Sequence, residues 1–467
     1  MIDLRNQQRS FGEGFIQETV DDLWEHWMRQ ADTLLEDEAL LATVYEALQR
    51  RHPRSSTHGR PGTPAEVVLR MLLLKHMRDW SFADLEREVR ASLLYREFTR
   101  VRAGKVPDAK TLGRLAQALD PEVIEKIHAR LVALAKEHKV VAGRRMRVDT
   151  TVVETNIHYP TDSSLLGDGV RVLTRLMKKV SQIAGEAGTR LRDRRRSVQH
   201  RLIEIGRASR SKGETAQERV KSLYGKLIEI TGRVAAQAKK FSTEIGQDVK
   251  RAGDVVQQAT LHALKQELDT MLPRVKQVMR QTKARVFGGD TRSEGKLVSI
   301  FEPGTEVIRK GKAGKPTEFG KLIKIQEAEN QIVIAYEVYE QRPNDKDLLV
   351  PSVQLHQQRL GRMPEMVAGD AGFYSAQAEA KLREIGVKRV SIPNRSTKSI
   401  ERRQHQKQRW FRKGQKWRTG CEGRISLLKR RHGLHRCRYK GTPGMKRWVG
   451  LGVLSDNLIN IGRALAG

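Results

Sequence analysis

The sequence predicts an α/β core with a mixed sheet, which a helical insertion interrupts and an all-α domain precedes. Three observations predict this class: a helical period through residues 1–140, strand-like sequence over 140–160, and a polar helical stretch that lies between two strand-rich regions. We therefore expect an N-terminal helical domain over 1–140, a core formed by 141–164 and 286–467, and an insertion over 165–285.

The N-terminal domain carries clear helix signals. The stretch AEVVLRMLLLKHM places apolar residues at helical spacing from Val67 onward. Ser81 is a predicted N-cap, with Asp84 completing a capping-box-like pair, and Asp108 stands near the start of a further short helix. Helices joined by such short turns fit either a helix-turn-helix or a plain helical bundle, so the domain is expected to bind DNA or to dimerise.

The predicted insertion has the spacing of a coiled coil. Its apolar residues alternate steps of three and four, and they are Val220, Leu223, Leu227, Ile230 and Val234. Pro273 is expected to kink or stop the last helix, because proline lacks the N–H that a helix interior needs. The arginine-rich run RLRDRRRSVQHRL fits either a DNA contact or a solvated helix face.

The core is predicted from alternating strand and helix patterns. The first strand lies in RMRVDTT, and strands resume at KLVSIFEPGTEVIRKGK and in the hairpin pattern FGKLIKIQEAENQIVIAYEVYE. The order then runs through the helix LLVPSVQLHQQRLG, the strand in PEMVAGDAGFYS, the helix SAQAEAKLREIG, the strand KRVSIPN and the helix CEGRISLLKRRHGLHR. The last of these helices is the final element that the pattern predicts.

Composition points to a polyanionic partner. The formal net charge is +33, and such a field attracts nucleic acid because each neutralised phosphate releases counterions. Cys421 and Cys437 offer no disulfide framework, which fits a reducing cytosol. No signal peptide or membrane-spanning run is expected, so the sequence predicts a soluble, cytoplasmic protein.

Three carboxylates stand in unusual places. Asp149 lies within a strand, Asp370 ends a strand, and Glu422 opens a helix in a cationic stretch. Functional residues of open α/β sheets gather at the carboxyl ends of strands, so Asp149 and Asp370 could be neighbours. Oxygen-only ligands favour Mg²⁺ or Mn²⁺, and a pair of such ions can promote an in-line phosphoryl displacement.

Cationic and aromatic side chains surround Glu422. Arg418, Glu422 and Lys429 follow helical spacing along one face, where the cations could grip phosphates next to the scissile one. A solvated row of salt bridges is the simpler reading of that face. Trp410 and Trp417 are interleaved in the preceding basic run, where they could stack on a base or simply pack.

Together these motifs resemble the DDE transposases of bacterial insertion sequences, which share an RNase H-like core. RMRVDTTVVETNIHYPTDSSLL resembles the first-Asp motif, MVAGDAGFYS the second, and RTGCEGRISLLKRRHGLHRCRYKG the Glu motif. DWSFADLEREVRASLLYREF followed by VPDAKTLGRLAQAL resembles the N-terminal helical module of the insertion-sequence 5-like group. The resemblance implies that Asp149, Asp370 and Glu422 are catalytic and bind two Mg²⁺ (or Mn²⁺) ions.

The resemblance also suggests how DNA is held. Arg418, Glu422 and Lys429 match the spacing of the family's Arg, Glu and Lys, but Gln415 stands where the family has Tyr. The expected DNA-binding residues are Arg418, Lys429, Arg424, Lys413, Trp417, Trp410 and Arg430. A homodimer that binds double-stranded transposon ends and target DNA is expected, because transposition joins two ends.

These observations predict a DNA transposase that cleaves transposon ends and transfers the freed strand. Two other functions remain open at this point. A non-catalytic DNA-binding protein would use the coiled coil and the basic surface to organise DNA. A nuclease on the same fold would hydrolyse DNA without joining it.

Overall fold

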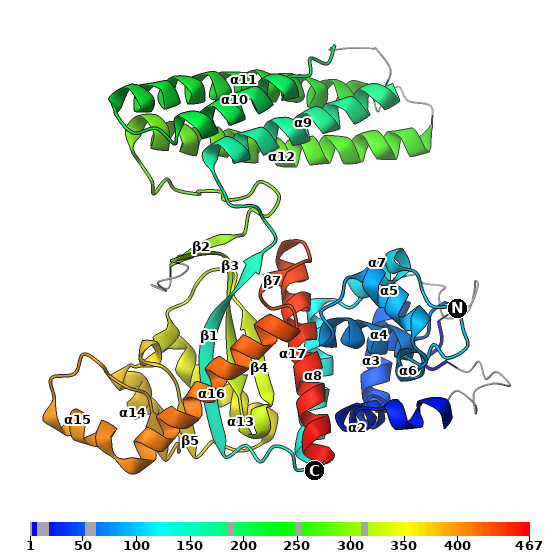
Figure 1. Ribbon diagram of the computed structural model, residues 1–467, viewed down its shortest axis with the longest axis vertical. Helices are drawn as coiled ribbons and strands as arrows, with labels where there is room; N and C mark the ends of the chain where they lie inside the picture. The colour runs from blue at the N-terminus through cyan, green and yellow to red at the C-terminus, as the bar shows by residue number, and fades with distance from the viewer. Residues whose placement is uncertain (1, 7–17, 52–61, 185–189, 249–253, 310–315) are drawn as a thin grey trace. The chain divides into compact units, whose positions relative to one another are not determined.

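The computed structural model describes the chain except for residues 1, 7–17, 52–61, 185–189, 249–253 and 310–315. It forms two compact units (Figure 1). The first, here called the sheet unit, contains residues 1–156 and 308–467, and the second, here called the bundle, contains residues 157–307. The helices of the first 140 residues thus belong to the same compact unit as the sheet.

A mixed sheet forms the centre of the sheet unit, as the sequence predicts, and it has seven strands among the residues that the structure describes. The strands are β1 (Arg145–Thr155), β2 (Glu306–Arg309), β3 (Thr317–Glu327), β4 (Val333–Val338), β5 (Met366–Ala368), β6 (Arg389–Ser391) and β7 (Arg436–Cys437). The order is β2-β3-β1-β5-β6, with β4 paired to β3 and β7 to β1. Strand β1 is antiparallel to β3 and parallel to β5.

Most predicted strands are confirmed, with one correction. The hairpin pattern forms β3 and β4, which pair antiparallel. The stretch 296–312 was expected to be strand from its start, but only β2 forms within it, and residues 310–312 lie outside the described part of the chain. Ser299 accepts hydrogen bonds from the N–H groups of Phe301 and Glu302, which turn the chain where a strand was expected.

Helices cover both faces of the sheet (Figure 1). Helices α13 (Leu349–Leu360) and α14 (Ala376–Glu384) pack on the face that carries Val148. Helices α16 (Arg409–Arg431) and α17 (Gly441–Leu465) pack on the opposite face with Val153. The short helix α15 (Ile400–Lys407) precedes α16, and the 3-10 turns η2 (Glu329–Gln331), η3 (Asp345–Leu348) and η4 (Ala371–Phe373) lie in the connections.

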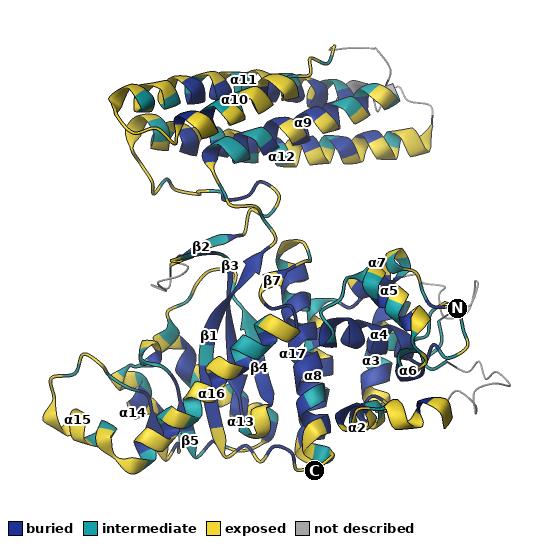
Figure 2. Ribbon diagram, viewed as in Figure 1, coloured by how far each residue is buried: buried dark blue, intermediate teal, exposed yellow. Residues whose placement is uncertain are grey.

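The N-terminal helices follow their predicted signals. They are η1 (Asp21–Leu23), α2 (His26–Leu34), α3 (Glu38–Gln49), α4 (Ala65–Met77), α5 (Phe82–Ala91), α6 (Leu93–Phe98), α7 (Ala109–Ala118) and α8 (Pro121–Glu137). Ser81 and Asp84 form the predicted capping box of α5, and Asp108 caps α7. Helix α4 is buried on every side, which makes it the centre of this part of the core (Figure 2).

The sequence pattern missed helix α17. Its glycines argue against a helix by propensity, yet Gly450 and Gly462 permit close packing. A Cβ at Gly450 would lie 2.4 Å from Ile124 and 2.4 Å from Tyr336, and one at Gly462 would lie 2.3 Å from the carbonyl oxygen of Trp27. Burial of this helix between the sheet and the N-terminal helices therefore outweighs its weak propensity.

The bundle consists of α9 (Asp162–Ala184), α10 (Arg195–Ala208), α11 (Glu214–Asp248) and α12 (Val255–Gly288). Leu223, Leu227 and Val234 of the predicted seam are buried in its core. Pro273 was expected to kink or stop this helix, and since α12 continues through it, the helix does not stop there. Leu272 and Val275 on either side are buried against the other helices, and this packing offsets the roughly 3 kcal/mol cost of an interior proline. Among the helices that the structure describes, none combines the length and apolar character needed to cross a membrane.

Candidate active site

Asp149 is more exposed than its neighbours on β1. The strand is buried from Met146 to Thr155 except at Asp149, whose side chain is 13% exposed. Its Oδ1 accepts a hydrogen bond from the N–H of Thr150 (2.7 Å). The side chain faces α16, because the Arg418 guanidinium lies 3.8 Å from Asp149 Oδ2. A carboxylate on the central strand is therefore presented to the helix that carries Glu422.

Asp370 follows the strand beside β1. The parallel register pairs Arg147 with Ala368, so Asp149 and Asp370 each come two residues after the last paired positions. Asp370 caps η4, and its Oδ1 accepts a hydrogen bond from the N–H of Gly372 (2.9 Å). The chain thus turns at the sequence GDAG, which leaves Asp370 at the carboxyl edge of the sheet next to the end of the β1–β5 ladder.

Asp345 is a fourth carboxylate at this edge, which the sequence analysis missed. A Cβ at Gly372 would lie 3.1 Å from Asp370 Oδ1 and 3.4 Å from Asp345 Oδ2, so both carboxylates flank this glycine. Asp345 Oδ1 also accepts a hydrogen bond from the Thr150 hydroxyl (3.2 Å). Its sequence context, RPNDKDLL, reads as an ordinary turn and gave no signal.

Glu422 lies on the exposed side of α16. Its side chain is 59% exposed and accepts a charge-assisted hydrogen bond from Arg418 Nη2 (2.8 Å). Since Arg418 also lies 3.8 Å from Asp149, one guanidinium lies between two of the three predicted carboxylates. The structure therefore brings Asp149 and Glu422 to the same cation, although they stand far apart in the sequence.

A buried ion pair fixes α16 against the sheet. Arg147, two residues before Asp149, donates from Nε to Glu327 on β3 (2.9 Å), and both side chains are buried. The same guanidinium donates to the Trp417 carbonyl oxygen and lies 4.8 Å from the centre of the Trp417 ring. A Cβ at Gly420 would lie 2.2 Å from Arg147, so this glycine lets the helix approach the arginine. Arg147 and Glu327 thus help to set where Glu422 stands relative to Asp149.

Gln415 provides a second attachment of α16. Its Nε2 donates to the carbonyl oxygens of Gly369 and Ser391, which follow β5 and end β6. A Cβ at Gly414 would lie 2.6 Å from the Ser391 hydroxyl, which itself donates to the Phe411 carbonyl oxygen (2.9 Å). The residue at the position of the family's Tyr therefore anchors the helix beside Asp370.

Arg424 has a structural role that the sequence analysis did not foresee. It was expected to bind DNA, but it is only 3% exposed and its Nη1 pairs with Asp456 of α17 (2.7 Å). His432 Nε2 lies 3.5 Å from the same carboxylate. Because a buried and paired guanidinium is not presented to solvent, Arg424 is removed from the expected DNA contacts.

The other expected DNA contacts differ in exposure. Lys413 and Arg430 are exposed, and Lys429 is half-buried. Trp417 packs on Arg147, and Trp410 packs edge-on against Phe411 (ring centres 5.6 Å apart). Both tryptophans thus have packing partners within the chain.

Burial shifts the pKa values of two groups near the site. Burial raises the pKa of Glu327, and the Arg147 guanidinium acts in the opposite direction. Burial also raises the pKa of the Cys421 thiol well above its ordinary value, and the charges of Glu327 and Asp149 add to this. Cys421 is therefore a neutral core residue next to Glu422.

The carboxylates have the right donors for a hard cation, although they do not enclose one. Carboxylate oxygens suit Mg²⁺ or Mn²⁺. Across the described ranges, no group of three or more His, Cys, Asp or Glu side chains is placed to hold a metal ion. The Arg418 guanidinium instead lies between Asp149 and Glu422, so a positive charge already occupies the space between these two acids.

Two protein-family models match parts of the chain. One, described as Transposase domain (DUF772), matches residues 19–118, and the other, described as Transposase DDE domain, matches residues 377–461. The second match contains Glu422 and all of α16, whereas Asp149 and Asp370 lie outside both. Searches of curated proteins and of solved structures find no match to the chain.

Proposed function

Because these two domains identify the chain as a DDE transposase of insertion-sequence type, we propose that it binds transposon ends, cleaves a phosphodiester bond there and transfers the freed 3′ end to target DNA. The observation that carries the proposal is that the Arg418 guanidinium lies next to the carboxylates of both Asp149 and Glu422. Arg418 thus links the first predicted motif, on β1, to the last, on α16, in a chain with a net charge of +33.

We propose an RNase H-like core for the sheet unit. The mixed sheet with β1 at its centre supports this, because an acidic residue on that strand faces the helix of the Glu motif. The proposed core comprises 141–164 and 286–467, with an insertion at 165–285 and an N-terminal domain at 1–140. The compact bundle of residues 157–307 supports the position of the insertion after β1.

In this proposal, Asp149, Asp370 and Glu422 are the catalytic residues and would hold two Mg²⁺ or Mn²⁺ ions. Bound metal would activate the attacking water or 3′-OH and stabilise the leaving oxygen. The all-oxygen donor set and the cation between Asp149 and Glu422 support this assignment. The exposed Glu422 side chain can change rotamer at low cost, since among the described residues its one ion pair is with Arg418.

The chain's own cations would hold the DNA next to the carboxylates. Arg418, Lys429, Lys413 and Arg430 would bind backbone phosphates, because they lie on the helix of Glu422. Trp410 and Trp417 would help only if they leave their packing partners to stack on a base. A homodimer would bring two ends together.

The test compares cleavage with binding. Asp149→Ala should reduce Mg²⁺-dependent cleavage of DNA that carries the gene-flanking ends by at least about 10³-fold, while the dissociation constant for that DNA stays within about twofold. A variant that cuts as fast as the wild type would refute the assignment. The wild type should also join a labelled 3′ end to a second duplex, and hydrolysis without joining would favour the nuclease.

A further inference from the structure

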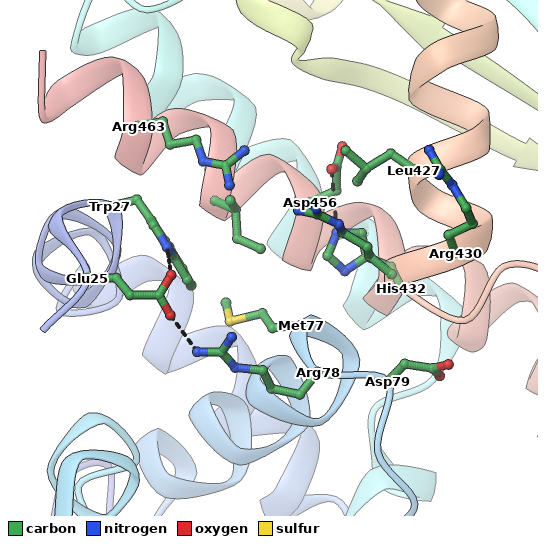
Figure 3. A pocket seen from close by; sticks show the side chains of 12 residues that line it. Glu25, Trp27, Met77, Arg78, Asp79, Leu427, Arg430, His432, Asp456 and Arg463 are labelled. Atoms are coloured by element: carbon green, nitrogen blue, oxygen red, sulfur yellow. Dashed lines mark hydrogen bonds and ion pairs between the residues drawn. The ribbon is translucent and has the colours of Figure 1, made fainter. Parts of the chain in front are cut away.

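A cavity of about 370 Å³ lies on the sheet unit between α2, α4, α16 and α17 (Figure 3). Its volume is in the range of ligand-binding pockets. Four arginines line it, namely Arg78, Arg430, Arg431 and Arg463. They come from the end of α4, from α16 and from α17, so the fold gathers them from separate parts of the chain.

The carboxylates of this cavity are already neutralised. Each forms an ion pair with an arginine, and the pairs are Glu25 with Arg78 (2.6 Å), Asp79 with Arg438 (3.3 Å) and Asp456 with Arg424 (2.7 Å). Each of these acids therefore has its ion-pair partner in an arginine other than Arg430, Arg431 and Arg463, although the Glu25 carboxylate also attracts Arg463 at longer range.

Three arginines line the cavity without an ion pair among the described residues, and of these Arg463 is weakly balanced by the Glu25 carboxylate. Arg430, Arg431 and Arg463 are exposed, and they form no ion pair with any residue that the structure describes. Arg430 Nε makes one long hydrogen bond, to the Ser426 carbonyl oxygen (3.4 Å). Three unpaired guanidiniums around one hollow favour an anion with several oxygens.

Apart from His432, the rest of the lining is apolar. Trp27, Met77, Leu427 and Ile459 contribute side chains between the arginines. A free inorganic phosphate has nothing to offer these surfaces, whereas the deoxyribose rings of a DNA backbone do. The mixture of cations and apolar groups thus fits a sugar–phosphate chain better than an isolated anion.

Helix α16 links the cavity to the candidate active site. Arg430 comes eight residues after Glu422 on this continuous helix, which is about 12 Å along its axis. That length equals the rise of about three to four base pairs. A strand engaged at Glu422 could therefore reach the cavity within a few nucleotides.

We propose that this cavity binds the sugar–phosphate backbone of transposon-end DNA three to four nucleotides from the bond cleaved at the carboxylates. The inference rests on the proposed function, since it assumes DNA at Glu422. It adds Arg431 and Arg463 to the DNA contacts and gives the helices α2 and α4 a place beside the bound end. Binding of the DNA backbone in the cavity would set how far the transposon end extends into the active site.

The first test removes the unpaired charges. The triple variant Arg430→Gln, Arg431→Gln, Arg463→Gln should weaken binding of end DNA at least about tenfold and lower the slope of log Kd against log salt by about two to three. The matched control is Arg50→Gln, Arg51→Gln, Arg114→Gln, which removes the same charge from exposed residues elsewhere on the sheet unit. Replacement of the three cavity arginines by lysine should restore most of the slope.

The second test locates the contact on the DNA. Neutral methylphosphonate linkages placed three to four nucleotides from the cleaved bond should weaken binding of the wild type but not of the triple Gln variant. Equal losses in the triple variant and its control, or insensitivity of the wild type to these linkages, would overturn the proposal. Failure of the proposed function is separate, because it would appear as undiminished cleavage by Asp149→Ala.

Discussion

The sheet unit and the bundle bury different kinds of residue. Beneath α16 the sheet unit buries ionised pairs, Arg147 with Glu327 and Arg424 with Asp456. The bundle core is built mainly from an apolar seam, which includes Leu227, and its buried acids Asp162 and Asp168 pair with arginines that are themselves exposed to solvent. A buried ion pair is costly to desolvate and contributes little net stability compared with apolar packing. The pairs beneath α16 are thus better explained by the geometry they impose than by the stability they add.

This difference suggests what each unit requires. An apolar seam tolerates small shifts along a helix, whereas a guanidinium bonded to a carboxylate and to the Trp417 carbonyl oxygen accepts few positions of α16. In the proposed active site, the sheet unit would have to hold Glu422 of α16 near Asp149 of β1. We expect buried ion pairs in this chain to lie where one element must keep a fixed position on another.

The largest expected effect is from breaking the pair beneath α16. Arg147→Ala leaves Glu327 buried without its cation, which should lower the free energy of unfolding by about 3–5 kcal/mol. Urea unfolding followed by hydrogen exchange should locate the loss in the sheet unit. As the matched control, Leu227→Ala should cost about 2–5 kcal/mol and reduce protection in the bundle. A change below about 1 kcal/mol in Arg147→Ala would contradict the comparison.

A double variant separates position from stability. Arg147→Met combined with Glu327→Leu replaces the pair with apolar groups and should recover most of the lost stability. It cannot restore the bond to the Trp417 carbonyl oxygen, so DNA cleavage should remain at least about tenfold below the wild type. If cleavage returns together with stability, the pair has no role in positioning Glu422.

A smaller effect is expected from acid. Burial, helped by the Arg359 charge, lowers the pKa of His128 to about 3 from its ordinary value of 6.5. A base whose pKa is depressed by folding contributes stability that is complete above its unfolded pKa and is lost as the pH falls toward the folded value. Lowering the pH from 7.5 to 5.5 should therefore cost the sheet unit at least about 1 kcal/mol.

The bundle serves as the internal control for this experiment. Its histidines, His158, His200 and His262, are exposed, whereas His128 is buried. Hydrogen exchange at pH 7.5 and 5.5, corrected for the intrinsic rates, should show lost protection in the sheet unit alone, and His128→Gln should reduce the loss. Equal losses in both units would contradict the comparison.

The sequence was most informative where a local rule applied. The capping box at Ser81, the hairpin of β3 and β4, and an acid within a strand at Asp149 each follow from a few neighbouring residues. The bond from Arg147 to Glu327 depends on a strand register between distant segments, and no spacing in the sequence indicates it. The same holds for Asp345, whose nearness to Asp370 arises only from the folded chain.

Helices α12 and α17 were misjudged for a related reason. Local propensity predicted a kink or a stop at Pro273 and gave no helix signal around Gly450, whereas tertiary packing keeps both segments helical. Arg424 shows the same limit for function, because its place in a basic run suggested DNA whereas its partner is Asp456.

The central claim is that Asp149, Asp370 and Glu422 hold metal together. The most direct measurement replaces Mg²⁺ with Fe²⁺, generates hydroxyl radicals with peroxide and ascorbate, and maps the cuts in the protein chain by mass spectrometry. Cuts should cluster near residues 149, 370 and 422, excess Mg²⁺ should suppress them, and Asp149→Ala should abolish them. Cuts at none or only one of these segments, or cuts that Mg²⁺ leaves unchanged, would contradict a shared metal site.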